Sequence, residues 1–192
     1  MKDTPIILAF VGMPGSGKDT CTDYVAKEHQ TPILHFGNMV YEEVQRRGLD
    51  IVTHEKAVRE DMRAKGGLAV LAERVADKAQ QYLAEGKTRI VLNGLYSWSE
   101  YKHLRELFGE QFVCVALAAP RALRYQRILS RNHTTDTHRK YTVEQVKERE
   151  YAEIENLEKG GPIAIADYTL LNSKTPDNLY RQLDELLDHI GF

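Results

Sequence analysis

Short apolar runs alternate along the chain with longer segments whose apolar residues recur every three or four positions. The apolar runs predict five strands, at 5–11, 32–36, 89–93, 112–117 and 168–172. The fourth run is apolar at every position, which is typical of a parallel strand buried on both faces. Strands that alternate with helices indicate an α/β fold, in which helices cover both faces of a parallel sheet.

Polar residues mark where several of the intervening helices begin. Ser97 with Glu100 and Thr142 with Gln145 have the spacing of a capping box. Gly160-Gly161-Pro162 is expected to interrupt the chain. The predicted helices are 18–29, 37–47, 54–64 with Thr53 as N-cap, 68–84, one that opens at 97–100, 120–131, 142–159 and 175–190.

The segment between the first strand and the first helix is rich in glycine and carries a lysine. It reads Gly12-Met13-Pro14-Gly15-Ser16-Gly17-Lys18-Asp19-Thr20. A strand, a glycine-rich loop, a lysine and a helix are together the context of a phosphate-binding P-loop. Glycines let backbone N–H groups approach an anion closely, and Lys18 adds a full charge at the outer phosphates. We therefore expect Gly12, Pro14, Gly15, Ser16, Gly17, Lys18, Asp19 and Thr20 to bind ATP, and we prefer this reading to a plain glycine-rich turn.

One position departs from the P-loop pattern. The usual loop has a serine or threonine after the lysine to hold Mg²⁺, whereas this chain has Asp19 followed by Thr20. Carboxylate oxygen is a ligand that Mg²⁺ accepts directly or through water. Asp19 and Thr20 are therefore the expected metal-binding residues.

Length, charge and cysteine content narrow the class of protein. The 192 residues predict a single domain, 1–192. The net charge of −2 disfavours general nucleic-acid binding. Cys21 and Cys114 form no disulfide framework and are expected to be core residues. Without an apolar run of membrane-spanning length or a signal peptide, we expect a cytoplasmic protein, monomeric or homodimeric, with no membrane partner.

Over nearly its whole length the chain resembles the P-loop nucleoside monophosphate kinases. It looks most like adenylate-kinase-related proteins that are also similar to dephospho-CoA kinases. Besides the P-loop, the resemblance rests on the segments 36–40, 91–95, 119–131 and 164–168. It implies a three-layer P-loop NTPase fold with ATP and Mg²⁺ at the loop. It also implies a helical segment for the phosphate acceptor at about 37–86 and a lid at about 131–141.

The same resemblance points to particular site residues beyond the P-loop. Arg124, Arg127 and Arg131 are spaced by three and four positions, as on one helical stripe. The resemblance implies that Arg127 and Arg131 clamp phosphates and act in catalysis together with Lys18. Arg149 is a weaker candidate of the same kind. Asn172 corresponds in position to the loop that borders the adenine base.

The acceptor segment departs from that family in a consistent direction. The family carries aspartates where this chain has Asn38 and Asn93, and arginines where it has Tyr41 and Tyr96. The residues placed at the acceptor by position are Gly37, Asn38, Tyr41, Asn93, Gly94 and Tyr96. Because a tyrosine cannot neutralise a phosphate, the acceptor could be a hydroxylated molecule rather than a plain nucleoside monophosphate.

Two hypotheses follow from this loss of charge. A nucleotide acceptor could instead be held at another angle by Arg46, Arg47, Arg59 or Arg63. Asp19 could replace the metal-orienting carboxylate that is absent at Asn93.

The sequence as a whole predicts a kinase that moves the γ-phosphoryl group of ATP·Mg²⁺ to a small acceptor, with a nucleotide-like acceptor as the leading choice. A dephospho-CoA kinase is the alternative within this class. A non-catalytic nucleotide-binding regulatory module is the alternative outside it, favoured by the lost aspartates and arginines and opposed by the P-loop and the lid arginines. An AAA-type motor is disfavoured, because the chain is short and lacks the acidic pair that ends a Walker B strand.

Overall fold

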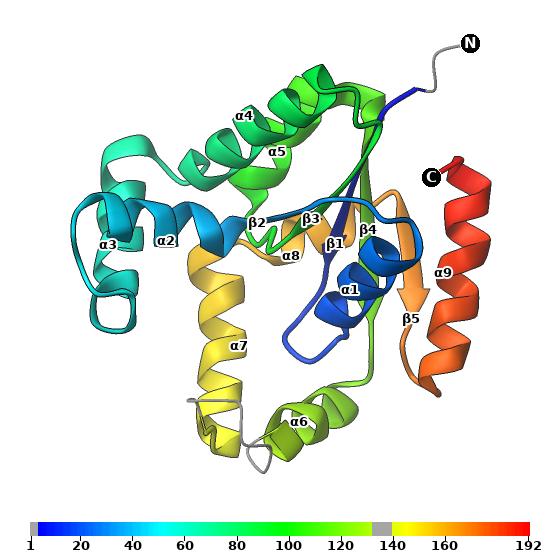
Figure 1. Ribbon diagram of the computed structural model, residues 1–192. Helices are drawn as coiled ribbons and strands as arrows, with labels where there is room; N and C mark the ends of the chain where they lie inside the picture. The colour runs from blue at the N-terminus through cyan, green and yellow to red at the C-terminus, as the bar shows by residue number, and fades with distance from the viewer. Residues whose placement is uncertain (1–3, 132–139) are drawn as a thin grey trace.

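The computed structural model describes residues 4–131 and 140–192, and its centre is a parallel five-stranded sheet (Figure 1). The strand order is β2-β3-β1-β4-β5. The strands are β1 (Ile6–Val11), β2 (Ile33–His35), β3 (Arg89–Asn93), β4 (Phe112–Ala118) and β5 (Tyr168–Leu171). A parallel sheet of this kind confirms the predicted α/β class, and each strand lies within about a residue of its predicted run.

Helices connect the strands and cover both faces of the sheet. They are α1 (Lys18–Glu28), α2 (Phe36–Arg46), α3 (Ile51–Gly66), α4 (Val70–Ala84), α5 (Trp98–Phe108), the 3₁₀ turn η1 (Gly109–Gln111), α6 (Arg121–Ser130), α7 (Val143–Leu157), α8 (Gly160–Ala164) and α9 (Pro176–Ile190). Within the described ranges, none of these helices combines the length and the apolar character that crossing a membrane requires.

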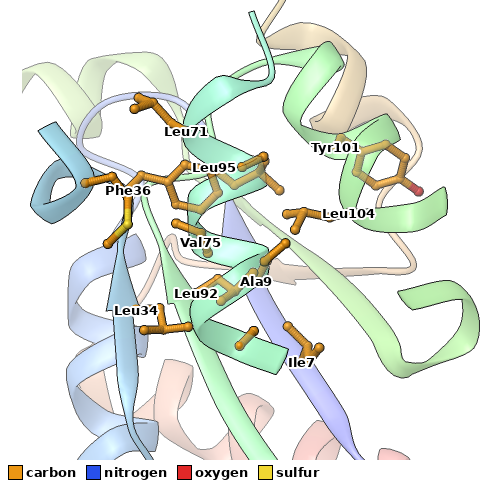
Figure 2. Close-up of a cluster of buried hydrophobic side chains, with 14 of the residues drawn as sticks. Ile7, Ala9, Leu34, Phe36, Leu71, Val75, Leu92, Leu95, Tyr101 and Leu104 are labelled. Atoms are coloured by element: carbon orange, nitrogen blue, oxygen red, sulfur yellow. The ribbon is translucent and has the colours of Figure 1, made fainter. Parts of the chain in front are cut away.

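The alternation of side chains along the strands divides the core into two halves. Ile7 and Ala9 of β1 face α2, α4 and α5, and Figure 2 shows this half of the core. Leu8 and Phe10 of the same strand face α1 and α9. This is the period-two pattern of a strand buried on both faces. The two predicted core cysteines are fully buried, one in each half.

The capping boxes at Ser97 and Thr142 are both present, and Thr175 caps α9 as its sequence indicates. The predicted N-cap of α3 was wrong. Asp50 caps this helix by accepting a hydrogen bond from the Thr53 N–H at 3.0 Å, so α3 begins at Ile51 rather than at residue 54. An aspartate is an equally good N-cap, and it starts the helix one turn earlier.

The predicted break at 160–162 lies slightly earlier, because α7 ends at Leu157 and residues 160–162 open the short helix α8. Pro162 lies in the first turn, where no backbone N–H is required. A Cβ on Gly161 would lie only 2.9 Å from the Trp98 ring, so the glycine lets α8 pack closely against α5. The proline and glycine therefore serve packing here instead of ending the structure.

The carboxyl ends of the strands gather the predicted site at one edge of the sheet. The P-loop follows β1, α2 follows β2, and residues 94–97 follow β3. Helix α6 follows β4, and Asn172 follows β5. In Figure 1, α2 and α3 stand to one side of the sheet, and α7 extends from their level toward α6. Ligands of open α/β sheets bind at this kind of edge.

Candidate active site

The P-loop is held in shape by its neighbours. Asn172 donates a hydrogen bond from Nδ2 to the Ser16 carbonyl at 2.8 Å, and the Ser16 N–H donates to the Met13 carbonyl at 3.1 Å. Gly15 has φ +79°, and a Cβ there would lie 2.6 Å from the Arg124 carbonyl. Only glycine fits both this backbone angle and this contact. The loop is therefore preorganised before any phosphate arrives.

Lys18 is a buried cation at the first turn of α1. Its Nζ donates to the Met13 carbonyl at 3.3 Å, and the residue is 9% exposed. Burial and, to a smaller extent, the nearby positive charge of Lys159 lower the pKa of this ammonium from 10.5 to about 7, although the negative charges of Asp19 and Glu153 act in the opposite direction. A poorly solvated ammonium gains more from a phosphate than an exposed one does. This environment suits the predicted role of Lys18 at the outer phosphates, which stays a prediction.

A cavity of about 460 Å³ opens beside Lys18. Its lining also includes Pro14 and Gly15 of the loop, Asp19, Arg131, Arg149 and Lys159. A second cavity of about 130 Å³ lies on the other side of the loop and is lined by Gly17, Thr20, Arg127 and Asn172. Gly15 and Arg131 line both. We refer to the first as the phosphoryl cavity and to the second as the small cavity.

The two expected metal ligands face different spaces. Asp19 lines the phosphoryl cavity, and its Oδ1 accepts a hydrogen bond from Asn93 Nδ2 at 3.3 Å. Thr20 lines the small cavity instead. Across the described ranges, no cluster of three or more His, Cys, Asp or Glu side chains could hold a metal by itself. Mg²⁺ in kinases is typically held by one or two carboxylates and by the nucleotide's own phosphates, so Asp19 fits a metal that arrives with the nucleotide.

The three arginines of the predicted stripe lie in different surroundings. Arg124 is buried, donates to the Pro14 carbonyl at 3.2 Å and pairs with Glu150 of α7, so it supports the loop from behind. Arg127 donates to Asn172 Oδ1 at 3.0 Å and lines the small cavity. Arg131 lines both cavities. The rest of the expected lid, 132–139, lies outside the described residues.

Helix α7 brings charged residues that the sequence stressed too little or missed. Glu153 accepts a hydrogen bond from Arg149 Nε at 2.9 Å and also pairs with Lys159. The Lys159 ammonium is buried and lies 4.4 Å from the centre of the Tyr96 ring. Glu158 has φ +52°, so the chain turns sharply after α7 and Lys159 enters the site. A lysine at a helix end more often faces solvent, and no local sequence signal marks this one.

The acceptor cavity, with a volume of about 810 Å³, lies between α2, α3, α7 and the end of β3. All six residues that the sequence placed at the acceptor line it: Gly37, Asn38, Tyr41, Asn93, Gly94 and Tyr96. Asp19, Tyr41, Tyr96 and Arg149 line the phosphoryl cavity as well, so the two spaces adjoin. Sequence reasoning missed Glu55, which also lines both.

The four arginines considered for the acceptor separate into two groups. Arg59 and Arg63 line the acceptor cavity. Arg46 and Arg47 are not among the described residues that line it, because they donate to Glu43, at 2.6 Å and 2.8 Å. Hydrogen bonds from Arg46, Arg47 and Arg74 hold the pKa of the buried Glu43 carboxyl well below its usual range. This cluster joins α2 to α4 and serves the scaffold.

Comparison with known proteins assigns the chain to a family. Residues 11–147 match the family model described as AAA domain. UPF0200 protein Ta0179 of Thermoplasma acidophilum is 32% identical over 182 residues, which cover 94% of each chain. The chain belongs to the AAA domain family and to the UPF0200 proteins. The UPF0200/UPF0201 protein of Archaeoglobus fulgidus is 30% identical over 182 residues. The match covers 94% of this chain and 54% of that relative, so the chain spans about half of its length.

Solved structures show the same fold in other proteins. TT1252 from Thermus thermophilus aligns with a TM-score of 0.66 and 21% identity, covering 97% of this UPF0200 chain and 98% of its own. Shikimate kinase from Acinetobacter baumannii aligns with a TM-score of 0.60 and 17% identity, over 98% and 94% of the two chains. A gluconokinase from Sinorhizobium meliloti 1021 aligns with a TM-score of 0.56 and 16% identity, over 98% and 97%. At these identities the likeness shows a fold shared with small-molecule kinases and no more.

The AAA description refers to the P-loop domain, and it leaves open whether the chain is a motor. Strand β3 ends with Leu92 and Asn93, so the acidic pair expected of such a motor is absent from that strand. The expectation that this UPF0200 protein is not an AAA-type motor stays a prediction.

Proposed function

We propose that the protein is an ATP- and Mg²⁺-dependent phosphotransferase that moves the γ-phosphoryl group to a small acceptor. The observation that carries the proposal is that the phosphoryl and acceptor cavities adjoin. The space beside Lys18 shares part of its wall with a second, larger space at the ends of β2 and β3. Phosphoryl transfer depends mainly on bringing two substrates together and neutralising charge, and this layout provides for both.

The side chains around the phosphoryl cavity suit the charge that moves during transfer. Lys18 and the loop N–H groups would hold the outer phosphates, and Mg²⁺ brought with the nucleotide would neutralise their oxygens. Arg131, Arg149 and Lys159 surround the same space and would stabilise the transferring group. Asp19, which accepts a hydrogen bond from Asn93, would orient the metal or its water. Because Glu153 fixes Arg149 and Lys159, these cations need little reorganisation.

A non-catalytic nucleotide-binding module is the second candidate. It is favoured by uncharged side chains at four positions where the related kinases have charged ones. These side chains are Asn38, Asn93, Tyr41 and Tyr96. An adjoining cavity of about 810 Å³ opposes it, because a protein that only binds nucleotide has no need of a second space beside the γ-phosphate. Dephospho-CoA kinase remains the alternative within the kinase class.

The test is ADP production from ATP and Mg²⁺ in the presence of candidate acceptors. The panel includes ribo- and deoxyribonucleoside monophosphates, dephospho-CoA, unphosphorylated hydroxyl compounds and a control without acceptor. We expect turnover that depends on one acceptor and is lost in Lys18→Met. ATP binding without turnover for any acceptor would contradict the proposal and favour the binding module.

A further inference from the structure

The charges that line the acceptor cavity cancel. Four lysine and arginine residues and four aspartate and glutamate residues are found among the described residues of its lining, which gives a formal net charge of zero with His35 neutral. The phosphoryl cavity of the same protein differs. Four cations and two carboxylates line it, which gives a net charge of +2. The protein therefore concentrates positive charge where ATP phosphates are expected and balances it where the acceptor is expected.

The cations on the α3 wall of the acceptor cavity pair with carboxylates on the same helix. Arg59 forms an ion pair with Glu55, one turn before it. Lys56 lies 4.0 Å from Glu60 at the exposed rim. A phosphate dianion that entered here would have to compete with these carboxylates or lie beside them.

The other two cations of the lining, Arg149 and Arg63, also lie near carboxylates. Arg149 donates to Glu153 at 2.9 Å. Arg63 lies 3.6 Å from Glu100, whose side chain is fully buried in the capping box of α5. Three of the four cations in the lining thus pair with a carboxylate on their own helix. Burial raises the pKa of Glu100, so this neighbour balances the charge of Arg63 less completely. This lining differs from a phosphate site, where arginine groups point at the anion without matching acids.

We propose that the acceptor is an uncharged, polyhydroxylated molecule and not a phosphorylated one. The inference rests on the proposed function. Carboxylate and amide oxygens accept hydrogen bonds from hydroxyls, and amide N–H and phenol groups donate to them, so the lining can satisfy a polyol without a net charge. Asn38, Asn93, Tyr41 and Tyr96 supply such groups in the lining of the cavity. The partly exposed Tyr41 ring also offers an apolar face to a sugar ring or a nucleoside base.

Matched pairs of acceptors test this charge preference. ADP release is measured with a nucleoside against its 5′-monophosphate and with a sugar against its sugar phosphate, each with ATP and Mg²⁺. We expect kcat/KM to be at least about tenfold higher for the unphosphorylated member of the pair that reacts, as a phosphate without matching cations implies. Turnover of the nucleoside or of the sugar shows which of these two classes of molecule is the acceptor.

The possible outcomes separate the inference from the proposed function. A preference for the phosphorylated member would overturn the inference and leave the kinase function standing. Turnover with no member of either pair and no other acceptor would overturn both.

A charge-changing variant tests the physical cause. Glu55→Gln makes the net charge of the lining +1 while keeping the shape of the side chain. We expect it to raise kcat/KM for the phosphorylated member about tenfold relative to its unphosphorylated partner, because one unit of charge is gained beside the acceptor. Glu42→Gln on α2 is the matched control, since Glu42 pairs with Lys78 and is not among the described residues of the lining. If both variants leave the ratio unchanged, charge balance does not select the acceptor.

Discussion

Replacing Lys18 with methionine should stabilise the nucleotide-free protein while abolishing its function. Lys18 is buried, and its pKa is lowered from 10.5 to about 7 in the folded protein. Holding an ammonium in so poorly solvated a position costs free energy that only a bound phosphate returns. Methionine has a similar length and no charge, so it can occupy the same space without that cost.

The magnitude follows from the difference between the two pKa values. A difference of about 3.5 corresponds to about 5 kcal/mol of lost stability when the lysine is protonated in both states, at about 1.4 kcal/mol for each pKa unit. This loss of stability reaches its full size below pH 7. Between pH 7 and 10.5 the unfolded chain binds more protons than the folded one, so the stability of the wild-type protein rises with pH through this window. The advantage of Lys18→Met should therefore be about 3 kcal/mol larger at pH 6 than at pH 9.

The assay is denaturant unfolding of both proteins at pH 6 and pH 9, without nucleotide and in a buffer free of phosphate. Lys27→Met is the control, because Lys27 is on the same helix and its side chain is 84% exposed. It should change stability by less than about 0.5 kcal/mol. Saturating ATP should raise the stability of the wild-type protein and of this control, but not of Lys18→Met. A Lys18→Met protein that is less stable than the wild type at pH 6, or whose advantage is the same at both pH values, would refute the reasoning.

Three further variants probe the rest of the site. Asp19→Ala should reduce phosphoryl transfer at least about 100-fold and change the ATP dissociation constant little, because its carboxylate is expected to act on the metal. ADP release measures the transfer and calorimetry measures the dissociation constant. An equal loss of transfer and of ATP binding would contradict this role. Lys159→Met should raise the pKa of Lys18 and so shift the pH dependence of ATP binding to higher pH. Lys159→Arg keeps the positive charge and should restore the wild-type profile. A profile that is unchanged in Lys159→Met would show that the two charges do not interact. Gly17→Ala should destabilise the fold by about 1 kcal/mol or more and weaken ATP binding, because its φ is +103° and the new Cβ would collide with Asn172; unfolding at the wild-type midpoint would argue against that collision.

The fold and the phosphate end of the site could be predicted because their signals are local. Uniform apolar runs mark strands buried on both faces, and the P-loop fixes the first strand, the loop and α1 in one stretch of sequence. The capping boxes at Ser97 and Thr142 are equally local, since each lies within four residues. The N-cap of α3 was missed because Asp50 and Thr53 are both good capping residues, and the sequence does not rank them.

The parts that could not be predicted depend on contacts between distant segments. Arg124 became a support for the loop because Glu150, 26 residues later, packs against it. Arg46 and Arg47 were candidates for the acceptor until Glu43, one turn earlier, proved to hold them. A pattern of arginines shows that cations are present, but it does not show which of them already have partners.

Lys159 changes the meaning of the tyrosines at the acceptor. From the sequence, Tyr96 in place of an arginine reads as a charge removed from the site. In the structure the Lys159 ammonium lies over the Tyr96 ring, in the wall of the phosphoryl cavity. A tyrosine face attracts a cation, so Tyr96 at this position can hold the Lys159 ammonium, which follows the end of α7. Positive charge thus lies beside Lys18 in the phosphoryl cavity, whereas the acceptor cavity has no formal net charge. This arrangement supports the proposed phosphotransferase over the binding module, because the cations that would stabilise a transferring phosphoryl group are present and only the charge expected at the acceptor is reduced.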